Sequence, residues 1–211
     1  DLGGLSGAQS LMTDAPAADT PTEIIPQPGI PLPGKRRDPH RIEQMLRVDH
    51  AGEYGAVAIY GGQRAIYGKL PHKARIARQL EEMEADEQVH LEAFDALLIK
   101  HHARPTALGP IWNMAGHALG AATALMGDKA AHACTEAVET VIEQHYAGQI
   151  TELRAMGEDE LADRFDQFRT EELAHRDLAI EEGAKDAPGY PLLSGLIQAG
   201  CRLAIKVSEK F

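Results

Sequence analysis

The sequence predicts an all-α protein, a four-helix bundle with two additional apolar helices. Apolar residues recur at i, i+3, i+4 and i+7 in four long segments, and this period corresponds to one face of a helix. Ala, Leu, Glu and Gln are frequent, which favours helix, and aromatic residues make up only 5% of the chain. No useful length of the chain alternates apolar and polar residues as a β-strand would.

The chain before the first helix differs from the rest. Residues 1–39 contain seven of the twelve prolines and have no helical period, so we expect a disordered or extended arm there. Residues 40–211 then form the folded domain. The pattern changes at Asp38 and Pro39, which is typical of a helix start because proline is tolerated in the first turn.

The first two predicted helices, 40–68 and 71–102, form a hairpin. Gly68 and Pro71 separate them. Each carries an apolar stripe that is interrupted by acidic residues. The stripes are Ile42, Leu46, Asp49, Glu53, Ala56 and Tyr60, and then Ile76, Leu80, Met83, Glu87, His90, Phe94 and Leu97.

Residues 107–127 form the next predicted helix and contain no Asp, Glu, Lys or Arg, with Gly116 and Gly120 four apart. Gly, Asn and Ala dilute this segment. We therefore expect it to lie in a membrane interface or over the bundle rather than to span a bilayer.

Two further bundle helices, 128–156 and 158–184, repeat the pattern of the first hairpin and are separated by Gly157. Their stripes are Thr135, Glu139, Ile142, Tyr146, Gln149 and Leu153, and then Leu161, Phe165, Phe168, Glu172, His175 and Ala179. The last predicted helix, 190–207, is mostly apolar. With 107–127 it would form an apolar, membrane-facing platform, although a plain core role stays open.

Each bundle helix places one Glu within its apolar stripe, and two of them add a His three residues later. These residues are Glu53, Glu87, His90, Glu139, Glu172 and His175. Residues three apart are neighbours on a helix face, so each Glu-x-x-His offers a paired oxygen and nitrogen donor. Buried ionised carboxylates must be paired or metal-bound. Four carboxylates and two imidazoles are the usual ligands of a diiron site in ferritin-like bundles.

The register of these residues is stronger evidence than the Glu-x-x-His pairs, which also arise by chance. Glu53 precedes Glu87 by 34 residues (87 − 53), and Glu139 precedes Glu172 by 33 (172 − 139). The spacing indicates a repeated helical hairpin. Carboxylate-rich ligands without thiolates suit iron or manganese, which composition does not separate, better than structural zinc. Two irons with open positions can bind and reduce O2.

Residues beside these six have two readings each. Asp49, one turn before Glu53, either orients a ligand histidine through its second ring nitrogen or is a solvated helix acid. His145 and Tyr146 lie near enough to Glu139 to border the site, although Tyr146 could equally be a core tyrosine. The histidines without a register partner are expected at the surface: His50, His101, His102 and His132.

Cysteine content and charge limit the environment and the partners. Cys134 and Cys201 lie far apart and outside any C-x-x-C, which favours buried reduced thiols over a disulfide and fits a reducing compartment. The first thirty-four residues show no secretory signal. A net charge of −11 disfavours nucleic acid and charge-driven adsorption to anionic lipid, so any membrane contact would be apolar.

Several motifs resemble the demethoxyubiquinone hydroxylases. They are Asp49-His50-Ala51-Gly52-Glu53-Tyr54-Gly55-Ala56, Glu87-Gln88-Val89-His90-Leu91, Ala133-Cys134-Thr135-Glu136-Ala137-Val138-Glu139, Glu143-Gln144-His145-Tyr146, Phe168-Arg169-Thr170-Glu171-Glu172-Leu173-Ala174-His175 and Ile197-Gln198-Ala199-Gly200-Cys201-Arg202. The resemblance covers residues from about 41 to 211. In combination the motifs are specific to that family rather than to ferritin-like bundles in general.

The resemblance implies a diiron monooxygenase. It would hydroxylate the ring of a demethoxylated polyprenyl benzoquinone with O2 and NADH, the penultimate step of ubiquinone biosynthesis. The family's metal ligands carry over to the six residues named above without substitution. The resemblance also implies that His145 and Tyr146 relay electrons from NADH, although the sequence contains no G-x-G-x-x-G.

The resemblance further implies a peripheral membrane protein that takes a quinone held in lipid. Its partners would be a ubiquinone-biosynthesis complex or a lipid-binding accessory protein, and a homo-oligomer stays open. The lack of an Arg-rich presequence favours the cytoplasmic side of the bacterial inner membrane over the matrix side of the mitochondrial inner membrane. Two alternatives remain. A rubrerythrin- or ferritin-like iron or peroxide oxidase needs no apolar platform, and a non-catalytic membrane-docking module leaves the stripe acids unexplained.

Overall fold

The structure is a computed structural model and describes residues 36–210. Throughout this part of the chain all regular secondary structure is helical, which confirms the predicted all-α class. The helices are α1 (Pro39–Tyr67), η1 (Pro71–Lys73), α2 (Ala74–Lys100), α3 (Gly109–Met126), α4 (Asp128–Met156), α5 (Asp159–Glu181), η2 (Ala184–Asp186) and α6 (Tyr190–Ser208). The predicted bounds agree to within a few residues. Most of the expected arm, residues 1–35, lies outside the described residues.

Local signals in the sequence set the helix ends. The side chain of Asp38 accepts a hydrogen bond from the backbone N–H of Arg41 at 3.1 Å and so caps the first turn of α1, with Pro39 at the first helical position. Gly157 ends α4 in the left-handed conformation, with φ of 80°. Gly127, with φ of 112°, separates α3 from α4. Glycine adopts such positive φ values without a steric penalty.

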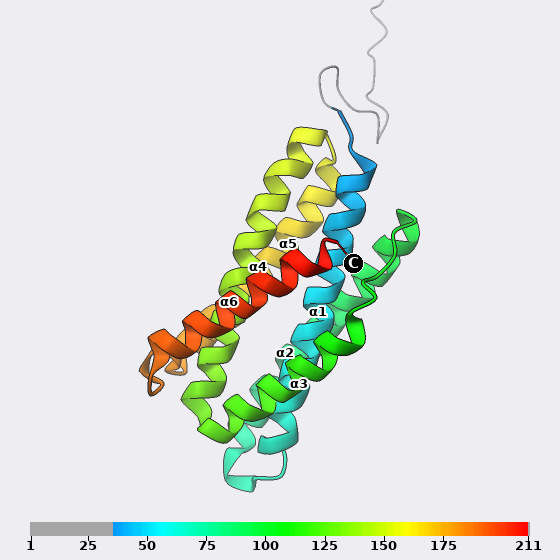
Figure 1. Ribbon diagram of the computed structural model, residues 1–211. Helices are drawn as coiled ribbons and strands as arrows, with labels where there is room; N and C mark the ends of the chain where they lie inside the picture. The colour runs from blue at the N-terminus through cyan, green and yellow to red at the C-terminus, as the bar shows by residue number, and fades with distance from the viewer. Residues whose placement is uncertain (1–35, 211) are drawn as a thin grey trace, which may run out of the picture. The chain divides into compact units, whose positions relative to one another are not determined.

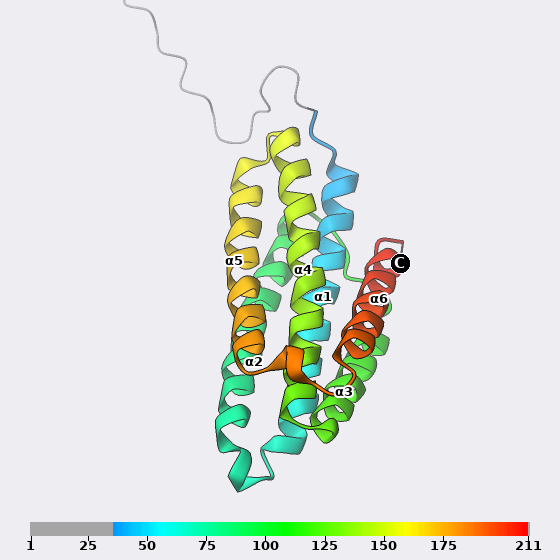
Figure 2. The ribbon, with the colours of Figure 1, turned by 90° about the vertical axis from the view of Figure 1, so that its left-hand side faces the viewer.

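The helices form two similar halves. α1 pairs with α2 and α4 with α5, and these four long helices form the bundle (Figure 1). α3 packs along α1, and α6 packs mainly on α4. In Figure 2 α3 and α6 lie on the same side of the bundle, and α5 lies on the opposite side. The site side chains are therefore enclosed by four helices, with two further helices over one face.

Two apolar clusters fill the bundle on either side of its acidic middle. One contains Phe94, Phe165 and Phe168 with residues of the first turns of α1 and the last turns of α4. The other is built around Leu80 and Met83 of α2 and the second half of α1. Glu53, Glu87 and their partners lie between these clusters along the same helices, so the acids are closed off from water at both ends.

Glycines allow α3 to approach α1 closely. A Cβ atom on Gly120 would lie 2.0 Å from the backbone oxygen of Ile59, and one on Gly62 would lie 2.2 Å from the backbone oxygen of His117. Real Cβ atoms essentially never come within 3.0 Å of such atoms. The backbones of these two helices are therefore in direct contact, and no larger residue fits at either position.

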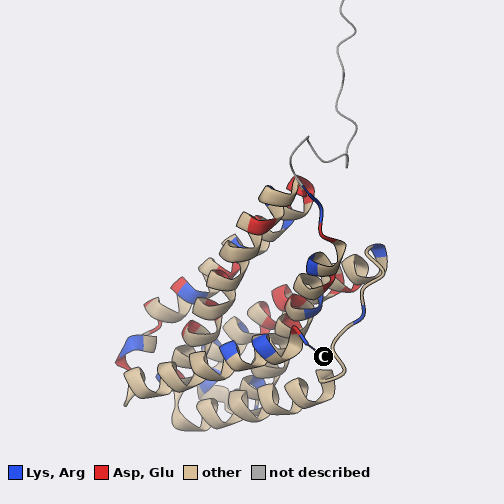
Figure 3. Cartoon of the chain, turned by 45° about the horizontal axis from the view of Figure 1, so that its top comes forward, with Lys and Arg blue, Asp and Glu red and all other residues tan. Residues whose placement is uncertain are grey.

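The outward faces of α3 and α6 are apolar. Their exposed large residues include Met114 and Leu125 on α3 and Leu192, Leu196 and Leu203 on α6. Figure 3 shows these two helices almost without charged residues. The charged residues in their sequences are Arg202 and Lys206, both on α6. No helix among residues 36–210 is apolar over enough length to cross a bilayer.

His132 and Cys201 differ from expectation in their burial. His132, predicted at the surface, is 2% exposed, because α4 is covered on several sides and has no solvent face at this position. Cys134 is buried as predicted, but Cys201 is only half-buried, since α6 covers the bundle from outside. Both thiols are free, in agreement with the predicted reduced state.

Candidate metal centre

The structure brings the six predicted residues together in two overlapping groups. Each group offers four ligand atoms that lie within 4.8 Å of one another. The first is Glu53, Glu87, His90 and Glu172, and the second is Glu87, Glu139, Glu172 and His175. Because Glu87 and Glu172 belong to both groups, their carboxylates are placed to bridge two ions.

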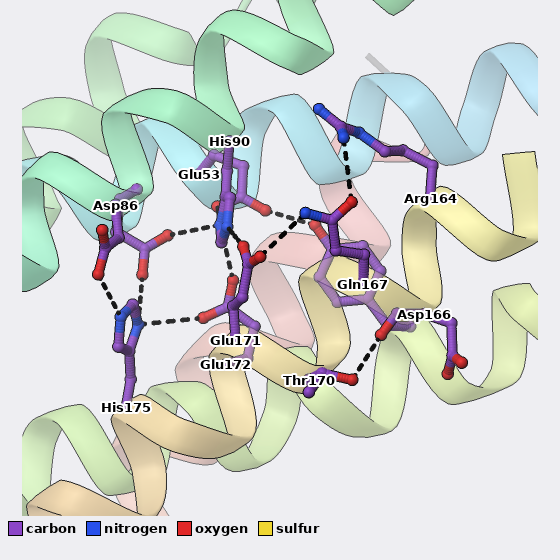
Figure 4. A network of polar contacts seen from close by, with 12 residues as sticks. Glu53, Asp86, His90, Arg164, Asp166, Gln167, Thr170, Glu171, Glu172 and His175 are labelled. Carbon is purple, nitrogen blue, oxygen red and sulfur yellow. Dashed lines mark hydrogen bonds and ion pairs between the residues drawn. The ribbon is translucent and has the colours of Figure 1, made fainter.

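Both histidines point the same ring nitrogen into the centre (Figure 4). Nδ1 of His90 lies 3.0 Å from Oε1 of Glu172, and Nδ1 of His175 lies 3.1 Å from Oε1 of Glu87. The helix register produces this arrangement, since each histidine follows a site glutamate by one turn and faces the glutamate of the opposite hairpin.

The outer nitrogen of each histidine meets an acid that the sequence analysis did not single out. Nε2 of His90 contacts Oε2 of Glu171 at 2.5 Å, and Nε2 of His175 contacts Oδ2 of Asp86 at 3.3 Å. Both acids are partly exposed. A carboxylate on the outer nitrogen fixes the ring orientation and leaves Nδ1 free for a metal.

Two tyrosines link the halves across the centre. The Tyr60 hydroxyl donates to Oε1 of Glu139 at 2.6 Å, and the Tyr146 hydroxyl donates to Oε1 of Glu53. Burial raises the pKa of both phenols, and the charge of the neighbouring glutamate adds to this effect. Each tyrosine therefore keeps its proton and holds one outer carboxylate in position.

The protein alone leaves too much negative charge in the centre. Burial, together with the neighbouring carboxylates, raises the pKa of Glu53 and Glu139 well above the usual range. For His175 burial lowers the pKa, but Glu172 and Glu87 outweigh it and raise the pKa to about 11. Without another cation, the site would therefore have to retain protons that neutralise its carboxylates.

The donor set fits divalent metal ions. Several buried carboxylate oxygens have no hydrogen-bond partner among the described residues, including Oε2 of Glu53, Oε2 of Glu87 and Oε2 of Glu139. Unpartnered buried carboxylate oxygens are costly, and metal coordination removes that cost. Two divalent ions would also balance four carboxylate charges with both imidazoles neutral.

Asp49 differs from both of its predicted roles. It is 4% exposed and so is not a solvated acid. It also contacts neither His90 nor His175. The outer ring nitrogens of these histidines contact Glu171 and Asp86, respectively. Its partners are His145 and Gln149 on α4. The rotation of α4 against α1 decides this pairing, and the period of one helix does not show it.

His145 and Tyr146 border the centre differently. Tyr146 is fully buried and contacts Glu53 directly, whereas His145 keeps a partly exposed ring and reaches the centre only through neighbours.

A separate cleft of about 670 Å³ lies beside the turn from α1 to α2, lined by Arg64, Tyr67 and Glu81 among others. It contains none of the six metal-centre residues.

Known proteins are similar to this chain over most of its length. The family described as "Ubiquinone biosynthesis protein COQ7" matches residues 40–208. A Rhodospirillum rubrum protein named 3-demethoxyubiquinol 3-hydroxylase is 50% identical over 181 residues, covering 85% of this chain and 82% of the relative.

Relatives from eukaryotes are also similar over most of this chain. The human protein named NADPH-dependent 3-demethoxyubiquinone 3-hydroxylase, mitochondrial, is 45% identical over 174 residues, covering 80% of this chain and 77% of the relative. The Saccharomyces cerevisiae protein named 5-demethoxyubiquinone hydroxylase, mitochondrial, is 36% identical over 184 residues, with coverage of 80% and 78%.

Proposed function

Because the chain belongs to the family of the ubiquinone biosynthesis protein COQ7, we propose that it is a diiron monooxygenase of ubiquinone biosynthesis. The substrate is a demethoxylated polyprenyl benzoquinone or its quinol, and the reaction adds a ring hydroxyl with oxygen from O2. The names of the relatives support the hydroxylase reaction and this substrate class.

The observation that carries the proposal is the buried set of four carboxylates and two inward-facing imidazoles in a ferritin-like bundle. Glu53 and His90 would hold one iron, Glu139 and His175 the other, and Glu87 and Glu172 both. When bound, two irons supply the activation of O2. The protein supplies the rest: Tyr60 and Tyr146 hold the outer carboxylates, and Asp86 and Glu171 hold the imidazoles.

The apolar faces of α3 and α6 support a membrane-embedded substrate. Their exposed residues, Leu125 and Leu196 among them, would enter the lipid interface and make the protein peripheral to the membrane. Both helices pack on the face of the bundle that α1 and α4 form. A prenylated ring could therefore pass from lipid to the metal centre without crossing water.

A reduced nicotinamide nucleotide is the proposed electron donor, with His145 and Tyr146 as the relay to the irons. The resemblance favours NADH, whereas the mitochondrial relatives are named as NADPH-dependent. The contact between Tyr146 and Glu53 supports the inner end of this relay.

The relatives include bacterial and mitochondrial enzymes. We propose the cytoplasmic side of the bacterial inner membrane as the location, with the matrix side of the mitochondrial inner membrane as the alternative. A complex of ubiquinone-biosynthesis proteins, a lipid-binding accessory protein and a second copy of the chain are proposed partners.

A turnover experiment tests the function. Iron-loaded protein is mixed with a short-chain demethoxyquinone, isotopically labelled O2 and either NADH or NADPH, and the product is analysed by mass spectrometry. We expect one labelled oxygen in the ring and nucleotide consumption that depends on the quinone. Repeated oxidation of added ferrous iron, with no oxygen entering the quinone, would instead favour a ferritin- or rubrerythrin-like oxidase.

A further inference from the structure

The two halves of the bundle are alike around the carboxylates but differ in one polar network. An offset of 86 residues relates positions on α1 to positions on α4, as for Glu53 and Glu139 (139 − 53) and for Tyr60 and Tyr146. Three neighbouring positions pair by the same offset: Gln63 with Gln149, Ile59 with His145, and Asp49 with Thr135. The set of Gln63, Ile59 and Thr135 contains no titratable side chain, and Gln63 donates to the backbone oxygen of Ala131 at 3.1 Å. The other set contains an acid and an imidazole.

Asp49, His145 and Gln149 form a compact unit at this second position. Oδ1 of Asp49 lies 3.4 Å from Nε2 of His145 and 3.0 Å from Nε2 of Gln149. Nε2 of Gln149 is also 2.9 Å from Nε2 of His145. The amide can donate to a neutral ring, and a protonated ring can donate to Asp49. Gln149 therefore stays beside the pair in both states of the imidazole.

The unit extends from the surface towards the metal centre. The side chain of His145 is 20% exposed and that of Asp49 is 2% exposed. Asp49 lies one turn before Glu53 on α1, and His145 directly precedes Tyr146, which donates to Glu53. Oδ2 of Asp49 has no partner among the described residues. The buried acid Asp49 therefore contacts the partly exposed imidazole of His145 and lies one helical turn from the metal-centre residue Glu53.

Charged groups from α1, from α4 and from the residue after α6 face the outer side of this unit. Arg41 of α1 bonds Glu152 of α4 at 2.9 Å and Glu209, just after α6, at 3.4 Å. For His145 burial lowers the pKa, but Asp49 and Glu209 outweigh it, and the net pKa is raised despite the charge of Arg41. Burial raises the pKa of Asp49, and its bonds to His145 and Gln149 oppose this only in part. Because its pKa is raised, the Asp49 carboxylate accepts a proton more readily than an exposed acid would.

We propose that His145 and Asp49 carry protons between solvent and the metal centre, with Gln149 as the positioning residue for both. This inference rests on the proposed function. Adding one oxygen atom of O2 to a ring C–H and releasing the other as water consumes two electrons and two protons. A hydride donor supplies both electrons and one proton, so the other proton must come from solvent. It binds Nε2 of His145, and then this N–H bond breaks as an O–H bond forms on Oδ1 of Asp49. Asp49 in turn loses the proton to the oxygen atom that leaves as water, so both side chains return to their starting states.

The matched variants are Asp49→Asn, which keeps the shape and loses the proton-carrying carboxylate, and Gln149→Leu, compared with Gln63→Leu at the equivalent position. Proton uptake is followed with a pH-indicator dye while the iron-loaded chain is chemically reduced, and quinone hydroxylation is measured separately. Iron content is determined for each variant.

We expect Asp49→Asn to slow both proton uptake and hydroxylation by at least about tenfold. A positioned acid or base typically contributes about a hundredfold or more to a rate, so this threshold is a low one. Added formate, a small acid, should restore part of the rate in this variant and leave the wild type unchanged. Gln149→Leu should slow proton uptake, and Gln63→Leu should not.

Uptake within twofold of the wild type in Asp49→Asn, or a loss of iron from that variant, overturns the proposal. If Asp49→Asn does not fold, the comparison of Gln149→Leu with Gln63→Leu decides, and equal effects overturn it. The two proposals can fail separately. Wild-type protein that takes up protons through Asp49 without hydroxylating the quinone refutes only the proposed function, and hydroxylation that is insensitive to Asp49→Asn refutes only the proton route.

Discussion

Replacing Gly120 with alanine should separate α3 from α1 and destabilise the protein. The added Cβ would lie 2.0 Å from the backbone oxygen of Ile59, whereas ordinary contact begins at 3.4 Å. The helices must therefore move apart by about 1.4 Å (3.4 − 2.0). Neither atom can move without its helix, because the oxygen of Ile59 belongs to the backbone of α1 and the added Cβ is bonded to the backbone of α3.

The expected cost follows from two opposing effects. Alanine is intrinsically better than glycine in a helix by about 0.5–1 kcal/mol. Overpacking a well-packed contact costs about 1–3 kcal/mol. The large displacement that the added Cβ requires places Gly120→Ala at the upper end of this range. For a chain of this size about 2 kcal/mol net corresponds to a fall in Tm of roughly 4–8 °C.

Thermal unfolding of a graded series measures this effect. The steric conflict decreases from Gly120, with a 2.0 Å contact, through Gly62 at 2.2 Å to Gly116 at 2.8 Å. Gly148 on α4 has nothing within 4 Å of its Cβ position, so Gly148→Ala serves as the control and should raise Tm slightly. A Gly120→Ala protein as stable as Gly148→Ala would show that the α1–α3 contact is looser than the structure has it.

Three further predictions concern the centre, the apolar face and pH. Glu139→Ala should reduce bound iron from two ions to one or none, because a carboxylate ligand and a compensating charge are lost; elemental analysis measures this, and zinc as the sole stoichiometric metal in iron-replete protein would contradict the assignment. Leu125→Asp combined with Leu196→Asp should stop flotation with neutral lipid vesicles while iron stays bound, since both side chains are exposed; release of wild-type protein by salt alone would argue against apolar binding. Burial lowers the pKa of His132 below 6.5, so the unfolded chain binds this proton more readily, and stability should fall as pH drops through 6.5 towards the folded-state value. His132→Gln should weaken that pH dependence in urea unfolding, and an identical slope in both proteins would rule out His132 as its source.

The periodic part of the fold was predictable from the sequence, and so was the inner ring of the centre. Helix period and register placed Glu53, Glu87, Glu139 and Glu172 on inward faces, because a helix fixes which residues share a side. Residues that depend on how helices are rotated against each other could not be placed in this way. Asp49 is the clearest case, since its partner lies on another helix 96 residues along (145 − 49).

A signal for the missed residues was nevertheless present in the repeat. Subtracting 86 from Tyr146 gives Tyr60, and subtracting 85 from Glu171 gives Asp86. Applying the offset to every neighbour of the six ligands would have indicated both pairs. The burial of His132 had no such signal, because it results from the covering of α4 by other helices rather than from a pattern within it.

The shared carboxylates have a consequence for how the molecule is held together. Each candidate iron would take three of its ligands from one half of the chain and a single carboxylate from the other, Glu172 for the first and Glu87 for the second. Neither half alone therefore supplies all four ligands of one metal site, because the fourth ligand comes from the other half. Two fragments divided at Gly127 should therefore reassemble when iron is added and separate when a chelator removes it. The metal pair would therefore crosslink the two halves reversibly and contribute to the assembly of the protein as well as to its chemistry.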